Sequence, residues 1–98
     1  MVKNKPYQEV LISRGNTETV IRKFSEYTNS EEFKWHWDEE DRIVQPLHPT
    51  DWMFQMDNNL PESISKNILI PAGEWHRIIK GTGSLSVKVI KIADKTNN

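Results

Sequence analysis

The chain has 98 residues, with 13 basic and 14 acidic side chains and a formal net charge of −1. This balance gives no electrostatic case for binding nucleic acid or a membrane surface, both of which call for a clustered basic face. The absence of cysteine excludes disulfides, thiolate metal ligands and a cysteine nucleophile.

A chain of this length buries roughly two-thirds of its unfolded surface, so we expect a single domain over residues 1–98 with frayed tails at 1–6 and 93–98. Residues 1–6 lack the apolar run of a signal peptide, and no stretch approaches the ~20 apolar residues of a membrane helix. The sequence therefore predicts a cytoplasmic protein with no membrane partner.

Short runs of strand-forming residues alternate with turn signals at intervals of roughly ten residues. Segment 17–27 fits either a helix or a strand, and we favour a strand. The predicted strands are 7–13, 17–27, 33–38, 41–45, 52–56, 68–70, 76–79 and 85–92. This pattern indicates an all-β sandwich or barrel.

The predicted strand 33–38 has two different faces, because side chains alternate along a strand. One face is polar and carries Lys34, His36 and Asp38. The other face is aromatic and carries Phe33, Trp35 and Trp37. Further along, Pro71 and Gly73 predict a type II turn, with Gly73 at the position that needs a positive φ. His76 then begins the next strand.

The segment Pro71-Ala72-Gly73-Glu74-Trp75-His76 matches the Pro-x-Gly-x-x-His core of the second cupin motif, and His36-Trp37-Asp38 stands where the first motif carries His-x-His. The chain thus resembles the cupin family over roughly residues 33–90, which implies a single-domain jelly-roll β-barrel. It is also similar to uncharacterised cupin-like proteins of marine phages and bacteria, through Trp35-His36-x-Asp38-x-x-Asp41-Arg42 and Gln55-x-Asp57-Asn58-x-Leu60-Pro61.

The metal ligands that the resemblance implies are incomplete here. Asp38 replaces the second histidine, and the family's glutamate falls near Arg42 or Ile43. His36, Asp38 and His76 remain, and two imidazoles with one carboxylate form a facial triad suited to Fe(II), with Mn, Ni or Zn as alternatives. The competing interpretation is that Asp38 pairs with a basic neighbour and that no metal binds.

A small polar or carboxylated molecule is the predicted ligand, bound in the mouth of the barrel with or without a divalent metal. The candidate ligand-binding residues are Lys34, Arg42, Gln55 and Trp75. Whether the protein is an enzyme is left open. A 2-oxoglutarate-dependent oxygenase is disfavoured, because Lys88 is the only nearby candidate for holding that cosubstrate.

A non-catalytic role is the alternative function. In this hypothesis the chain is a homodimeric interaction module or phage accessory protein with a degenerate metal site. Trp35 and Trp37 would then be buried by packing or between subunits.

Overall fold

A computed structural model describes residues 7–27 and 29–92, in which strands dominate. The strands are β1 (Tyr7–Arg14), β2 (Thr17–Phe24), β3 (Asp41–Pro46), β4 (Met53–Met56), β5 (Glu62–Ser63), β6 (Ile68–Ile70), β7 (His76–Ile79) and β8 (Leu85–Ile92). The predicted all-β class is confirmed. The tails 1–6 and 93–98 lie outside the described residues. Within the described ranges, no helix is long and apolar enough to cross a bilayer.

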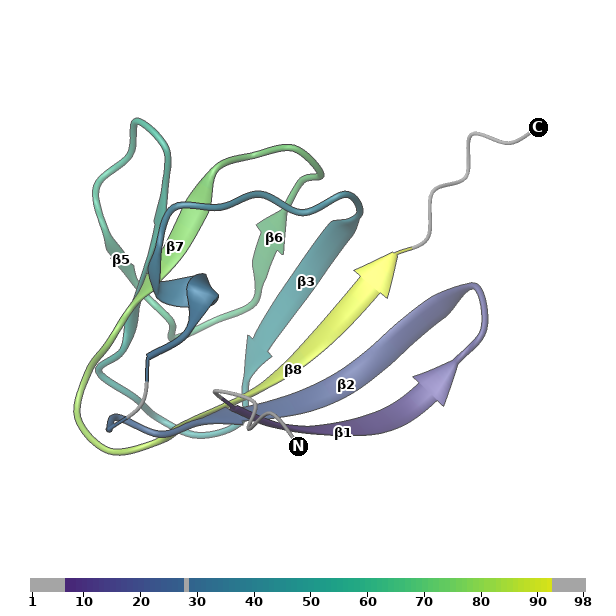
Figure 1. Ribbon diagram of the computed structural model, residues 1–98, viewed down its shortest axis with the longest axis horizontal. Helices are drawn as coiled ribbons and strands as arrows, with labels where there is room; N and C mark the ends of the chain where they lie inside the picture. The colour runs from purple at the N-terminus through teal and green to yellow at the C-terminus, as the bar shows by residue number, and fades with distance from the viewer. Residues whose placement is uncertain (1–6, 28, 93–98) are drawn as a thin grey trace, which may run out of the picture.

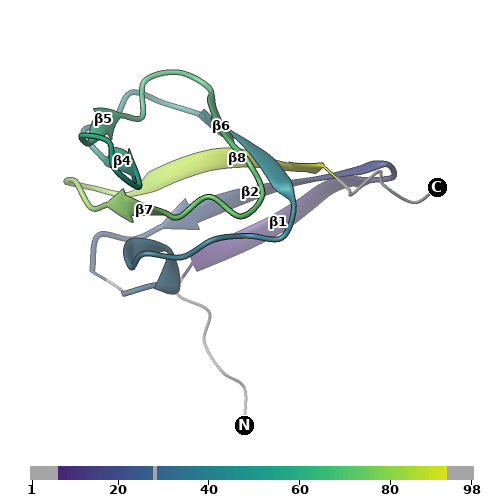
Figure 2. The same ribbon diagram turned by 90° about the horizontal axis from the view of Figure 1, so that it is seen from above.

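The strands form two antiparallel sheets. One has five strands in the order β1-β2-β8-β3-β6, and the other has three in the order β5-β4-β7. The turn of the β1–β2 hairpin lies on the opposite side of the molecule from β5 and β7 (Figures 1 and 2). The part of the five-stranded sheet near β6 and the start of β8 therefore lies closest to the smaller sheet.

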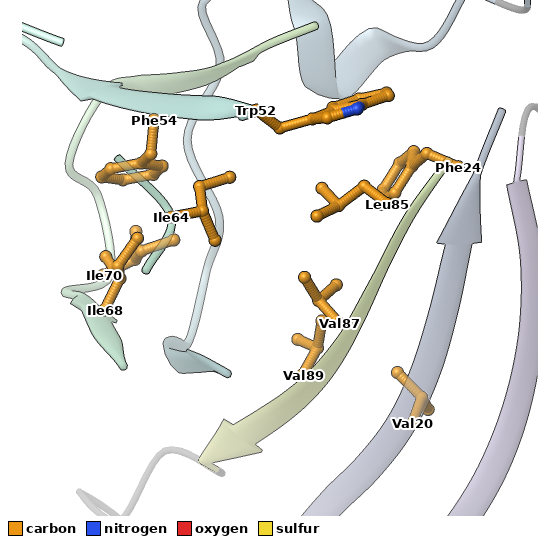
Figure 3. Packing of buried hydrophobic residues seen from close by; sticks show 10 residues of the cluster. All are labelled: Val20, Phe24, Trp52, Phe54, Ile64, Ile68, Ile70, Leu85, Val87 and Val89. Atoms are coloured by element: carbon orange, nitrogen blue, oxygen red, sulfur yellow. The ribbon is translucent and has the colours of Figure 1, made fainter. Parts of the chain in front are cut away.

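The hydrophobic core lies between the two sheets (Figure 3). Strand β8 contributes every second residue from Leu85 to Val89 to it, as expected for a strand with one buried face, and β2 contributes Val20 and Phe24. Trp52 is fully buried and packs against Phe24 and Phe33, with ring centroids 6.2 and 5.8 Å away. The ten core residues are Val20, Phe24, Trp52, Phe54, Ile64, Ile68, Ile70, Leu85, Val87 and Val89.

The structure confirms the strand interpretation of the ambiguous segment and the predicted turn. Strand β2 covers residues 17–24 and pairs with β8 from Thr17↔Ile92 to Phe24↔Leu85. Gly73 has a φ of 82°, and the Glu74 amide donates to the Pro71 carbonyl at 3.2 Å. These are the features of a type II turn.

The prediction of a strand over 33–38 is wrong. Residues Glu31–Phe33 form a short 3₁₀ helix, η1, capped by Ser30, whose hydroxyl accepts from the Glu32 amide at 3.1 Å. Ser and Thr at this position satisfy free amides at a helix start, and that local bond competes with strand pairing. In the remainder of the segment, residues 34–38, only His36 pairs with a neighbouring strand, as an isolated antiparallel bridge to His76.

Candidate metal centre

Three potential metal ligands meet at one place in the structure. The ligand atoms of His36, Asp38 and His76 all lie within 4.8 Å of one another. His36 and Asp38 come from the segment after η1, and His76 is the first residue of β7. The structure therefore brings together all three residues that the sequence proposed as ligands.

Backbone pairing holds the two histidines opposite each other. The His36 amide donates to the His76 carbonyl at 3.0 Å, and the His76 amide donates to the His36 carbonyl at 2.8 Å. Their ring centroids are 4.3 Å apart. His76 is buried and His36 half-buried, whereas Trp35 and Trp37 on either side of His36 are 41% and 49% exposed. The alternation expected for a strand thus survives around His36 itself.

Both imidazoles use the same nitrogen for a backbone hydrogen bond. Nδ1 of His36 lies 2.8 Å from the Lys34 carbonyl, and Nδ1 of His76 lies 2.8 Å from the Glu74 carbonyl. A carbonyl can only accept, so Nδ1 carries the hydrogen in each ring. In the neutral rings Nε2 then keeps a free lone pair. This orientation by a backbone carbonyl is the usual arrangement of a histidine that binds metal.

Asp38 completes the group with a buried carboxylate oxygen. Its Oδ2 lies 3.3 Å from Nε2 of His76 but accepts no hydrogen bond within residues 7–27 and 29–92. Oδ1 lies 3.5 Å from the Arg42 guanidinium. A proton on Nε2 of His76 would make this contact an ion pair, and a divalent metal can take the place of that proton. The two imidazoles and the carboxylate are a donor set that fits such a metal, once small rotations bring the outermost atoms closer.

The electrostatic surroundings keep Asp38 ionised. Burial raises the pKa of its carboxyl, but His76, Arg42 and His36 together outweigh burial and hold the pKa below its ordinary value of 3.8. An ionised carboxylate is the form that binds a metal ion. The Asp38 carboxylate is therefore in its metal-binding form at neutral pH.

A cavity of about 40 Å³ lies between the sheets beside these ligands. The triad and Arg42 line its polar end, together with Arg22 and Glu32, and core side chains line the rest. Sequence reasoning missed Arg22 and Glu32. A usable signal existed, because Arg22 alternates with Val20 and Phe24 on the face of β2 that points into the core.

Ion pairs link the charged groups at the polar end of the cavity. Arg22 pairs with Glu9 at 3.7 Å and Glu32 at 3.5 Å, while Arg42 pairs with Glu40 at 2.8 Å and with Asp38. Glu9 and Glu40 do not line the cavity, so two guanidinium groups face two carboxylates there.

The predicted ligand-binding residues fall into two groups. Arg42 lines the cavity. The other three lie elsewhere: Lys34 is exposed and pairs with Glu31 at 3.7 Å, Gln55 accepts from Nε of Arg77 at 2.9 Å, and Trp75 is 47% exposed. The wrong strand prediction for 33–38 explains why Lys34 was expected in the site. Lys34 directly follows η1 and does not share the inner face with His36.

The whole structure resembles solved cupins. A cupin domain from Bordetella pertussis superposes with a TM-score of 0.68 at 14% identity, covering 96% of this chain and all of the other. A cupin superfamily protein from Desulfitobacterium hafniense has a TM-score of 0.68 at 13% identity, covering 96% and 84%. This chain has the cupin fold. No protein-family model matches this sequence, and no curated protein matches it.

Two further structural neighbours carry names that state an activity. A DMSP lyase from Ruegeria pomeroyi has a TM-score of 0.71 at 13% identity and is matched over 95% of this chain, which spans half the length of that lyase. A putative mannose-6-phosphate isomerase from Ralstonia eutropha has a TM-score of 0.67 at 13% identity, covering 89% and 86%. At these identities the likeness concerns the fold alone.

Proposed function

We propose that this cupin binds a small polar or carboxylated molecule through a divalent metal held by His36, Asp38 and His76. The observation that carries the proposal is the buried Oδ2 of Asp38, which faces Nε2 of His76 without a hydrogen bond. A metal ion would satisfy both atoms. The lyase and the putative isomerase among the structural neighbours support a role in small-molecule chemistry.

The size of the cavity restricts what can enter. One water needs about 10–15 Å³ of such volume, so about 40 Å³ holds two or three waters or a group of a few atoms. A carboxylate or hydroxyl end of a ligand fits this space, with the remainder of the molecule outside. Arg42 lines the cavity with its guanidinium 3.5 Å from Asp38, and a guanidinium can pair with such a carboxylate.

The ion would supply Lewis-acid chemistry at an oxygen of the ligand. The residues of the chain have separate roles. The backbone bridge between His36 and His76 holds the two rings, the Lys34 and Glu74 carbonyls set their tautomers, and the core side chains exclude water from the inner end of the cavity.

Metal analysis of protein made without a histidine tag tests the proposal. After incubation with Fe(II), Mn(II), Ni(II) or Zn(II) and gel filtration, the parent should retain about one ion per chain. His76→Ala should retain none, and His48→Gln is the matched control because His48 lies outside the triad. A parent that retains none of the four ions would contradict the proposal. Small carboxylates can then be screened for stabilisation that needs the metal.

A second candidate function, association into a homodimer, is favoured by strand β1. This strand is at an edge of the five-stranded sheet, and within the described ranges nothing pairs with its outer side. Val10, Leu11 and Ile12 are 58%, 49% and 52% exposed. Three consecutive exposed apolar residues on an open eight-residue edge favour pairing with another strand, and we propose a second copy as the partner.

Sedimentation velocity separates this association from the metal hypothesis. We expect a dimer in the parent and a shift to monomer in Val10→Lys/Ile12→Lys, both measured with and without metal. His76→Ala should still dimerise. A parent that stays monomeric up to the highest soluble concentration would rule out the dimer and leave the metal site untouched.

A further inference from the structure

The outer surface behind the triad carries exposed tryptophans. Because His36 and His76 pair in antiparallel fashion, Trp37 stands across from Trp75, and Trp35 stands across from Arg77. The two histidines point toward the cavity, and these neighbours point the other way. Trp35, Trp37 and Trp75 are 41%, 49% and 47% exposed.

Two of these tryptophans line a shallow, open groove together with an acidic residue. The groove has a volume of about 240 Å³ and is lined by Trp35, Asp57 and Trp75. The Asp57 amide donates to the Trp75 carbonyl at 2.9 Å, which fixes the acidic residue beside that ring. Asp57 is exposed, and its carboxylate makes no ion pair in the part of the chain that the structure describes.

The structure already contains a cation on one of these rings. The Arg77 guanidinium lies 4.8 Å from the centroid of the Trp35 ring and is held there by Gln55. Arg77 does not line the groove, so it leaves the groove itself open. Tryptophan faces attract cations, and aromatic rings combined with a nearby carboxylate form the cages that recognise alkylated ammonium groups.

We propose that the groove between Trp35, Asp57 and Trp75 binds a small organic cation of the quaternary ammonium type. The Asp57 carboxylate supplies the charge, and the two indole rings supply polarisable sides that suit methyl groups better than a strongly hydrated ion. The groove is on the opposite side of the His36–His76 bridge from the cavity. The inference is therefore independent of the metal.

NMR titration of the four tryptophan indole N–H signals tests this site. The probe is tetramethylammonium chloride, added to metal-free protein at constant ionic strength set with sodium chloride. We expect saturable shifts at the indoles of Trp35 and Trp75, with smaller changes at the buried Trp52. tert-Butanol, a neutral probe of similar shape, should give much weaker shifts.

Variants distinguish binding in the groove from nonspecific binding to the aromatic surface. Asp57→Asn and Trp75→Ala should each weaken binding of tetramethylammonium at least about threefold. Trp37→Ala is the matched control, because Trp37 is equally exposed but does not line the groove, and it should bind like the parent. Absence of saturation, equal binding of tert-butanol, or equal weakening by Trp37→Ala would each overturn the proposal. So would indole shifts that follow protein concentration alone, which would assign the surface to a second copy.

Discussion

Oδ2 of Asp38 lies 3.3 Å from Nε2 of His76, and yet this buried oxygen accepts no hydrogen bond in the described part of the chain. Buried polar atoms are nearly always satisfied, so an exception calls for an explanation. The Nδ1 bond of His76 to the Glu74 carbonyl leaves Nε2 without a hydrogen to offer in the neutral ring. With a proton on Nε2 the two side chains form an ion pair, and without it both atoms are electron donors that face the point where a metal ion could replace the proton.

Replacement of the carboxylate should abolish metal binding without loss of the fold. In Asp38→Asn the amide can donate to Nε2 of His76, so we expect the metal-free stability to stay within about 1 kcal/mol of the parent. Metal at 100 times its Kd should stabilise the parent by about 2.7 kcal/mol and leave the variant unchanged. Thermal unfolding with and without Zn(II) measures both. Glu39→Gln serves as the control, and an equal metal effect in Asp38→Asn would contradict the assignment.

Gly73 should matter for both the turn and the site. Its φ of 82° lies in the left-handed region, and its amide donates to the Asp38 carbonyl at 2.9 Å. We expect Gly73→Ala to cost about 1–2 kcal/mol in urea unfolding and to weaken metal binding. Gly15→Ala is the matched control, because Gly15 has open space around it and no positive φ. Equal costs in the two variants would argue against a special role for the turn.

Trp52 should be the most important tryptophan for stability. It is fully buried, packs on Phe24 and Phe33, and donates through Nε1 to the Gly83 carbonyl at 3.2 Å. Trp52→Ala should lower the free energy of unfolding by about 3–5 kcal/mol. Trp37→Ala should lower the free energy of unfolding by much less, because Trp37 is half-exposed. Urea denaturation followed by circular dichroism gives both values, and a large loss at Trp37 would show that its surroundings are covered in solution.

Low pH should remove the stabilisation of the folded state by the Asp51 carboxylate. Its carboxylate accepts from the Thr82 amide and hydroxyl, each at 2.8 Å, and the amide bond is the main cause that holds the pKa below the ordinary value of 3.8. Because the folded-state pKa is lower than the unfolded one, the stabilisation is complete above pH 3.8 and disappears as pH falls through the folded pKa. The stability difference between the parent and Asp51→Asn should therefore shrink below pH 3.8. A difference that is constant from pH 6 to pH 2 would contradict this linkage.

The sequence carried enough information to predict the antiparallel fold and the triad, for local reasons. Pro71 and Gly73 restrict the backbone at their own positions, so the turn that delivers His76 could be predicted without knowing the rest of the chain. The alternating apolar residues in 85–92 likewise indicate which face of that strand is buried. The cupin motifs then paired His36 and Asp38 with His76.

One error came from a local hydrogen bond and the other from interactions between segments. The alternation in 33–38 favoured a strand, but the Ser30 hydroxyl caps η1 and only His36 finds a partner. Strand period alone cannot show how many neighbours a segment will pair with. Arg22 was overlooked because its partners Glu9 and Glu32 come from two other elements, and the ion pairs that allow its burial are visible only in three dimensions.

The bridge between His36 and His76 joins segments that are far apart in the sequence, each through a residue that also offers a metal ligand. An ion bound by both rings would close a long loop in a chain that has no cysteine to do so. The amide hydrogens of these two residues lie in the same bridge. Their exchange with solvent should slow when the ion binds, so that hydrogen exchange at two backbone positions becomes a direct record of occupancy.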